Sequence, residues 1–190
     1  KEHLGTHLTR IHNQIKRLNN VINDVLILEK NEQEKLKSVS EPLYIINFIS
    51  TLISEFNDQR PPTSKIKPHF PDKERLIYSD PVWLTHVFKN IIENALKYSL
   101  PEDQVPELTL TYMPKTFEIK IKDYGMGIPK EDQKYIFDSF FRSKNVSNIK
   151  GTGLGLNIVN EFVKKLGGKI KFKSELGAGS EFIVKLPYKS

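Results

Sequence analysis

Residues 117–129 read FEIKIKDYGMGIP, an alternating run that ends in an aspartate and two glycines. The apolar residues up to Ile121 occupy every second position, which predicts a half-buried β-strand. Asp123 then stands where Gly125 and Gly127 make the backbone unusually permissive. Aspartate beside glycine is ordinary turn chemistry, so a structural interpretation of this stretch competes with a ligand-binding one. The rest of the chain decides between them.

The sequence around this stretch has the texture of a compact α/β domain. The Pro-rich residues 60–71 predict a loop with at most a short strand. The other predicted elements are a helix over 43–56, a strand over 75–79, a helix over 80–99 with Asp80 as N-cap and Pro81 at its first position, strands over 107–113 and 117–124 joined by Pro114 and Lys115, a helix ending near Leu166, and a hairpin over 168–187.

The first thirty residues have a different pattern. Apolar residues recur there at alternating steps of four and three, which is the seam of a helix that packs against another helix. They are Leu4, Leu8, Ile11, Ile15, Leu18, Ile22 and Val25. No proline precedes Pro42, so one helix is expected from near Glu2 to about Lys37. We therefore predict two domains, residues 1–40 and 41–190.

Composition limits the classes of function. The chain has 190 residues, no cysteine and a formal charge of +6. The absence of cysteine excludes disulfides and thiolate metal sites and fits a reducing compartment. No stretch approaches the ~20 apolar residues of a membrane span. The positive charge suits an anionic partner, such as nucleotide phosphate, nucleic acid or a membrane surface, although scattered lysines also serve solubility alone.

Four polar residues of the predicted helix 80–99 share one helical face. Asn90 and Asn94 are four residues apart, and Lys97 and Tyr98 follow seven and eight residues after Asn90. Amide oxygens are suitable ligands for Mg²⁺, lysine neutralises phosphates, and an aromatic ring covers a base. The alternative is an ordinary solvated helix face.

The segment GTGLGL, residues 151–156, indicates phosphate binding. Gly151, Gly153 and Gly155 allow several backbone N–H groups to point at one anion, and the helix that follows adds its positive end. The segment is not a Walker A loop, because Gly-Lys-Ser/Thr does not follow after four intervening residues. It is not a dinucleotide fingerprint either, because Leu156 occupies the place of the third glycine. No signature of a eukaryotic-type protein kinase is present.

Together these motifs resemble those of bacterial sensor histidine kinases. HVFKNIIENALKYS is similar to the N box, DYGMGIP to the first glycine box, IFDSFFRS to the F box, GTGLGL to the second glycine box and GAGSEF to the last glycine element. Their order and spacing agree over residues 42–190. LNNVINDVLILEKNE, residues 18–32, resembles the second helix of the dimerisation and phosphoacceptor hairpin. The resemblance implies a Bergerat fold, an α/β two-layer sandwich whose mixed, mostly antiparallel sheet has helices on one face.

The resemblance also implies roles for individual residues. Asp123 would accept a hydrogen bond from the adenine amine, and Gly125 and Gly127 would let base and backbone approach. Asn90 would bind the metal and Arg142 would reach the terminal phosphate, so these two are the catalytic candidates. The remaining nucleotide contacts would be Asn94, Lys97, Tyr98, Lys150, Gly151, Thr152, Gly153, Leu154 and Gly155. Residues from about Asp138 to Lys150 resemble a mobile ATP lid.

The implied activity is transfer of the γ-phosphoryl group of ATP, with Mg²⁺, to a histidine, for relay to the receiver domain of a response regulator. Hydrolysing relatives carry a glutamate where this chain has His86, which is either an auxiliary base or a helix-surface residue. His3, His7, His12, His69 and His86 all lack the acid that follows the acceptor histidine. The resemblance therefore implies an acceptor on an upstream helix outside these residues.

The expected parent is a homodimer that reaches the membrane only through other parts, with this portion in the cytosol. Two alternatives stay open from the sequence: a degenerate nucleotide-binding adaptor, and a basic nucleic-acid-binding module suggested by charge alone. We predict no nucleic acid among the partners.

Overall fold

The computed structural model describes residues 39–58, 60–61, 64–99, 104–146, 149 and 151–189, together with four isolated positions. Those four, Ile15, Ile22, Val25 and Leu26, are helical and exposed. The chain divides into two units, residues 1–37 and 38–190. The predicted helix from Glu2 to Lys37 otherwise lies outside the described residues, so the division into domains 1–40 and 41–190 stays a prediction.

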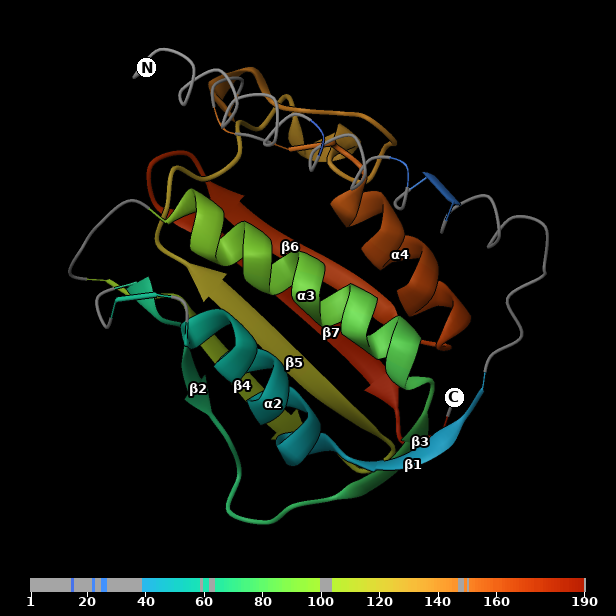
Figure 1. The fold of residues 1–190 in the computed structure, drawn as a ribbon. Helices are drawn as coiled ribbons and strands as arrows, with labels where there is room; N and C mark the ends of the chain where they lie inside the picture. Colours follow the sequence, from blue (N-terminus) through green and yellow to red (C-terminus); the bar gives the residue numbers. More distant parts are fainter. Residues whose placement is uncertain are drawn as a thin grey trace, which may run out of the picture. The chain divides into compact units, whose positions relative to one another are not determined.

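Two sheets organise the second unit (Figure 1). In the larger sheet β2 runs parallel to β4, and the other neighbouring strands are antiparallel. Its spatial order is β2 (Lys67–His69), β4 (Glu107–Tyr112), β5 (Thr116–Asp123), β7 (Gly179–Pro187) and β6 (Lys169–Glu175). A separate antiparallel pair consists of β1 (Glu41–Tyr44) and β3 (Leu76–Ser79).

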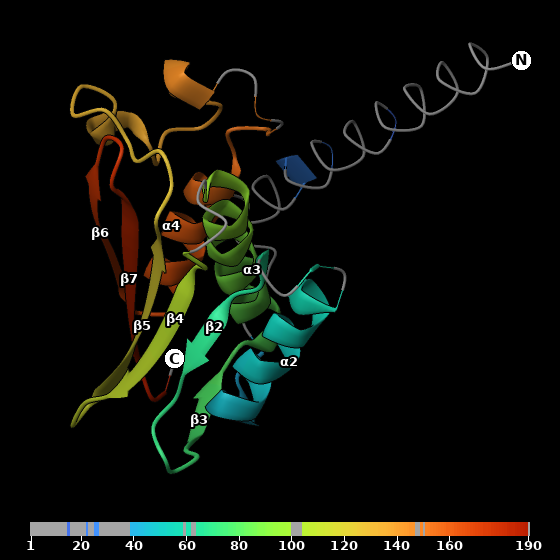
Figure 2. The same cartoon turned by 90° about the vertical axis from the view of Figure 1, so that its left-hand side faces the viewer.

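The helices α2 (Ile45–Asn57), α3 (Pro81–Tyr98) and α4 (Gly155–Lys165) all cover one face of the larger sheet (Figure 2). The core lies between these two layers. Every second residue of β5, including Phe117, Ile119 and Ile121, is buried there. Because each helix also places an apolar stripe on this side, burial of the shared interface holds the two layers together.

Sequence signals place α3 accurately. Asp80 is its N-cap, and the carboxylate oxygen Oδ1 accepts hydrogen bonds from the backbone N–H groups of Val82 at 2.9 Å and Trp83 at 3.0 Å. Pro81 occupies the first helical position, where its missing N–H has no cost. The other oxygen, Oδ2, accepts from the N–H of Val39 at 2.9 Å, so the cap also fixes the start of the unit.

The predicted two-layer α/β sandwich, with helices on one face of a mostly antiparallel sheet, is confirmed. The predicted start of the helix over 43–56 is wrong, because Leu43 and Tyr44 belong to β1 and the helix begins at Ile45. Short 3₁₀ turns, η2 (Gln133–Tyr135) and η3 (Lys144–Val146), lie in the loop before α4. Among the described residues, no helix combines the length and apolar character needed to cross a bilayer.

Candidate functional site

Asp123 is the last residue of β5 and is almost fully buried, at 4% exposure. Its Oδ1 atom accepts hydrogen bonds from the backbone N–H groups of Gly125 at 3.0 Å and Ser180 at 3.2 Å. Burial raises the pKa of the Asp123 carboxyl above its ordinary value, and the two backbone hydrogen bonds oppose that rise. Within the described part of the chain, both hydrogen bonds of this carboxylate are accepted by Oδ1. The carboxylate is therefore held by one oxygen and has the other available to a ligand.

Two glycines in the turn after Asp123 allow backbone from other elements to approach the turn closely. Gly125 forms an isolated antiparallel bridge with Ser99, just beyond the C-terminus of α3, and a Cβ atom on Gly125 would overlap the Tyr98 carbonyl. Gly127 has φ +65°, and a Cβ there would overlap the carbonyl of Glu175. Close approach of backbone thus requires glycine at both positions, and the positive φ requires it at Gly127 as well. The structural and ligand-binding interpretations of DYGMGIP are compatible, because the turn presents the carboxylate.

The polar face of α3 points toward the glycine segment that precedes and begins α4. A Cβ atom on Gly155 would lie 2.5 Å from the Oδ1 atom of Asn90, and one on Gly151 would lie 2.7 Å from the Nζ atom of Lys97. Lys97 Nζ also lies 3.0 Å from the hydroxyl of Tyr98. The structure therefore brings Asn90, Lys97 and the glycines together, and Asn94 is half-buried on the same helix.

Asn90 is oriented by its own helix. Its Nδ2 group donates a hydrogen bond of 2.8 Å to the backbone carbonyl of His86, which turns Oδ1 toward Gly155. The ring of His86 packs at 5.5 Å from the ring of Phe162 on α4. His86 therefore has an aromatic neighbour and a backbone role, and both fit a histidine that supports the helix pair.

The second glycine segment is bonded to the loop before it. The Leu154 N–H donates to Thr152 Oγ1 at 3.2 Å, and the Gly153 carbonyl accepts from the Phe140 N–H at 3.0 Å. Leu154 is fully buried, so its side chain belongs to the core and only its backbone faces the segment. Gly153 has φ +77°, and a Cβ there would lie 2.7 Å from the carbonyl carbon of Phe140.

Arg142 is engaged within its own loop. One guanidinium nitrogen donates to the carbonyls of Val146, at 2.8 Å, and Ile149. The structure thus places Arg142 on the backbone of the segment that resembles a lid. Lys150 lies outside the described residues, and mobility of the segment from Asp138 to Lys150 stays a prediction.

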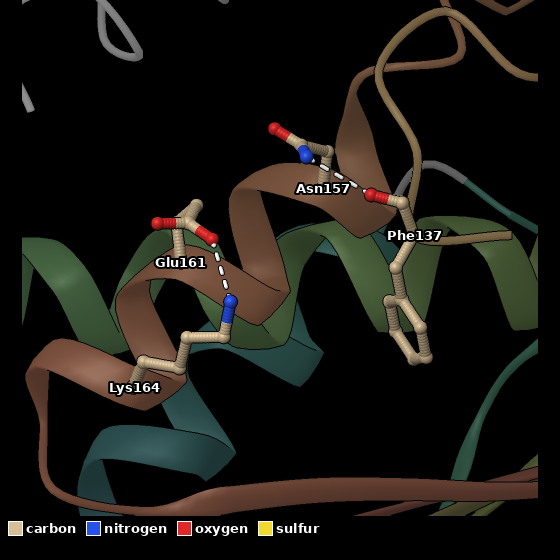
Figure 3. Close-up of polar contacts among 4 residues, drawn as sticks. All are labelled: Phe137, Asn157, Glu161 and Lys164. Carbon is tan, nitrogen blue, oxygen red and sulfur yellow. Dashed lines mark hydrogen bonds and ion pairs between the residues drawn. The ribbon is translucent and has the colours of Figure 1, made fainter. Parts of the chain in front are cut away.

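Sequence reasoning missed several residues that build the site. Ser180, in the element GAGSEF, supplies the second N–H to Asp123, and Asn157 donates to the carbonyl of Phe137 at 2.9 Å (Figure 3). The glycines of that hairpin mark a place where backbone approaches closely, but they do not identify Ser180 as the donor. No sequence pattern pointed to Asn157, since its partner is twenty residues away and is a main-chain atom.

Residues 79–190 match the family model described as histidine kinase-, DNA gyrase B-, and HSP90-like ATPase. The chain is 34% identical over 180 residues to the sensor histidine kinase WalK of Bacillus subtilis (strain 168). That match covers 93% of this chain and 30% of WalK, so this chain spans less than a third of that relative.

Solved structures give the same picture of the fold. The Acinetobacter baumannii histidine kinase AdeS superposes with a TM-score of 0.77 at 23% identity, covering 96% of this chain and 84% of AdeS. The mycobacterial sensor histidine kinase MprB superposes with a TM-score of 0.66 at 27% identity, covering 78% of this chain and 97% of MprB. The predicted Bergerat fold is confirmed, and these comparisons give no support to the adaptor alternative.

Proposed function

Because the chain belongs to the histidine kinase-, DNA gyrase B- and HSP90-like ATPase family, we propose that it is the ATP-binding catalytic region of a sensor histidine kinase. The observation that carries this proposal is the buried carboxylate of Asp123. Its Oδ1 atom accepts two backbone hydrogen bonds, which leaves Oδ2 to accept a hydrogen bond from a ligand. The amine of adenine is such a donor, and guanine presents a carbonyl in its place. A buried acceptor left without its donor costs binding free energy, so the site selects adenine.

The residues around Asp123 fit the rest of a nucleotide. The backbone carbonyl of Tyr98 lies against Gly125, and the Tyr98 ring would cover the base. Lys97 Nζ lies against Gly151, where phosphates would be neutralised. Asn94 shares the face of α3 with Asn90 and Lys97. Thr152, Gly153 and Gly155 would offer backbone N–H groups at the start of α4, and Leu154 would do so on release of its N–H from Thr152 Oγ1. Gly127 would let the backbone of the adenine loop approach the base.

Asn90 is the proposed Mg²⁺ ligand. Its amide is turned by the hydrogen bond to the His86 carbonyl, so a hard oxygen faces the glycine segment. The described residues contain no cluster of three histidine or acidic side chains, so here the protein would supply few ligands and the nucleotide phosphates the others. Mg²⁺ supplies neutralisation of phosphate charge when it is bound.

We assign the reaction as transfer of the γ-phosphoryl group to a histidine outside these 190 residues, for relay to the aspartate of a response-regulator receiver domain. Arg142 would leave the carbonyls of Val146 and Ile149 to reach the terminal phosphate. This chain has His86 where hydrolysing relatives carry a glutamate. Without that carboxylate to activate water, transfer of the phosphoryl group is favoured over hydrolysis. The parent would act as a membrane-anchored homodimer, with this region in the cytosol and no role in nucleic-acid binding.

Titration with a fluorescent ATP analogue, with and without Mg²⁺, tests nucleotide binding. We expect saturable binding that Mg²⁺ strengthens and that ATP reverses more effectively than GTP. Equal competition by GTP would remove the role given to Asp123, and the absence of binding would refute the proposed function.

Incubation with labelled ATP and Mg²⁺ tests the transfer. We expect no acid-labile phosphohistidine on this chain, because none of its five histidines is followed by an activating acid. A separately supplied acceptor hairpin from the same parent should be labelled slowly, since tethering is lost. Robust labelling of one of the five histidines would contradict an acceptor outside this chain.

A further inference from the structure

Asn157 ties the loop before the second glycine segment to α4. It is the third residue of that helix, and its Nδ2 group donates to the backbone carbonyl of Phe137 (Figure 3). The ring of Phe137 also packs edge-on against Phe172 of β6 at 5.8 Å. Both the backbone and the side chain of Phe137 are therefore fixed to regular secondary structure.

Three residues further along, the same loop binds the glycine segment directly. Phe140 donates its N–H to the Gly153 carbonyl and adopts φ +64°, which is rare for a bulky residue. The residue is 62% exposed, so burial of the side chain does not explain the strained backbone. The strain is offset by the hydrogen bond and by packing against Gly153, whose missing side chain makes room for the Phe140 backbone.

These contacts fix one peptide group of the glycine segment. The carbonyl of Gly153 accepts from Phe140, and the N–H of Leu154, in the same peptide, donates to Thr152 Oγ1. If Phe137 loses its anchor, the strained Phe140 can relax and the Gly153 peptide can rotate. The backbone N–H groups of this segment would then change direction.

We propose that Asn157 is a positioning residue of the phosphate half of the nucleotide site, acting through the backbone of residues 137–140 and Gly153. This inference rests on the proposed function, in which residues 151–155 bind the phosphates. It does not involve the adenine half, because Asp123 is held by Gly125 and Ser180.

The test compares Asn157→Ala with Lys164→Ala, which breaks an exposed 3.0 Å ion pair to Glu161 on the same helix. Affinity for ADP should fall about two- to tenfold in Asn157→Ala, the factor that corresponds to one neutral hydrogen bond. Affinity for adenosine, which lacks phosphates, should stay within about twofold, as should both affinities in Lys164→Ala. Amide exchange of Phe140 should be faster in Asn157→Ala alone.

Equal losses for ADP and adenosine would show a general structural role and overturn the proposal. Faster exchange at Phe140 with unchanged ADP affinity would also overturn it, because the loop would then not position the phosphate segment. If the unmodified protein binds neither nucleotide nor nucleoside, the proposed function fails instead. The exchange rate of Phe140 would still report whether Asn157 anchors the loop.

Discussion

The two ends of the candidate site are built in different ways. At the proposed adenine end, Asp123 is the last residue of a central strand and is held by backbone from β7 and from the loop that meets the end of α3. At the proposed phosphate end, the described residues between Phe137 and Gly155 are tied by isolated contacts, such as the hydrogen bonds from Asn157 to Phe137 and from Phe140 to Gly153. The end with Asp123 is therefore built into the packed sheet, whereas the other end is a loop segment joined to the sheet and to α4 by a few contacts.

This difference predicts where substitutions act. Changes at the adenine end should reduce both the stability of the domain and its choice of base, because the same groups serve packing and recognition. Changes at the phosphate end should alter affinity and release rates with little loss of stability, because Leu154 is the only buried side chain among the described residues between 137 and 155.

The largest expected effect is on stability, from Gly125→Ala. The added Cβ would overlap the Tyr98 carbonyl, and both backbones belong to the packed end of α3 and β5. We expect the free energy of unfolding to fall by about 3 kcal/mol or more. Thermal and urea unfolding measure this change.

Two further glycines serve as controls for that substitution. Gly177 has φ +81° with nothing within 4 Å of an added Cβ, so Gly177→Ala should cost ~1–2 kcal/mol from backbone strain alone. Gly153→Ala, at the phosphate end, should cost less stability than Gly125→Ala because its loop can shift. A Gly153→Ala protein as unstable as Gly125→Ala would remove the distinction between the two ends.

The second effect is on base selection, from Asp123→Asn. The variant can keep an acceptor for Gly125 and Ser180 while placing a donor where Oδ2 stood, so the fold should persist. Affinity for ATP should fall by about 2 kcal/mol, the worth of a hydrogen bond to a charged group. Calorimetry with ATP and GTP measures it, and a folded variant with unchanged preference would make Asp123 a turn residue only.

A smaller effect concerns pH. Burial raises the pKa of Asp123 in the folded protein above its unfolded value, so its proton is bound more tightly in the folded state. For this group alone, stability is therefore highest below the unfolded pKa and is lost as pH rises through the folded pKa. Base recognition has the opposite dependence, because a protonated Oδ2 cannot accept from the adenine amine.

ATP affinity should thus begin to fall, on acidification, at a higher pH than an ordinary aspartate with pKa 3.8 would give. The measurement is affinity against pH for the unmodified protein and for Asp123→Asn. Titration of the nucleotide itself affects both proteins equally, so the difference isolates the carboxyl. Parallel profiles would mean that the carboxyl does not titrate in the recognition step.

The sequence predicted what depends on local pattern. Alternation located β4 and β5, the Asp80-Pro81 pair located the start of α3, and the motif order made Asp123 a candidate site residue, which stays a prediction. It did not predict β1, because Glu41–Tyr44 is short, contains a proline and becomes a strand only by pairing with β3.

The parts of the site that the sequence did not reveal are contacts between distant backbone groups. Ser180 meets Asp123 across 57 positions, and it does so through an N–H that any residue except proline carries. The left-handed φ of Phe140 is equally invisible, since the residue type argues against it and only the packing of Gly153 permits it. A sequence specifies side chains, whereas these contacts are made by main-chain groups that nearly all residues share, so the residue types do not reveal them.

The smallest expected effect comes from a hydrogen bond that joins the two ends. Asn145, in the 3₁₀ turn η3, donates its Nδ2 group to the Gly127 carbonyl at 3.3 Å. The distance is long and the side chain is exposed, so Asn145→Ala should speed release of a fluorescent ADP analogue by about twofold at most. Stopped-flow displacement measures the rate, and Asn47→Ala, which removes an exposed amide on α2, is the control. A tenfold faster release in Asn145→Ala would contradict the distinction between the two ends, because one weak contact between loops would then determine how long the whole nucleotide stays bound.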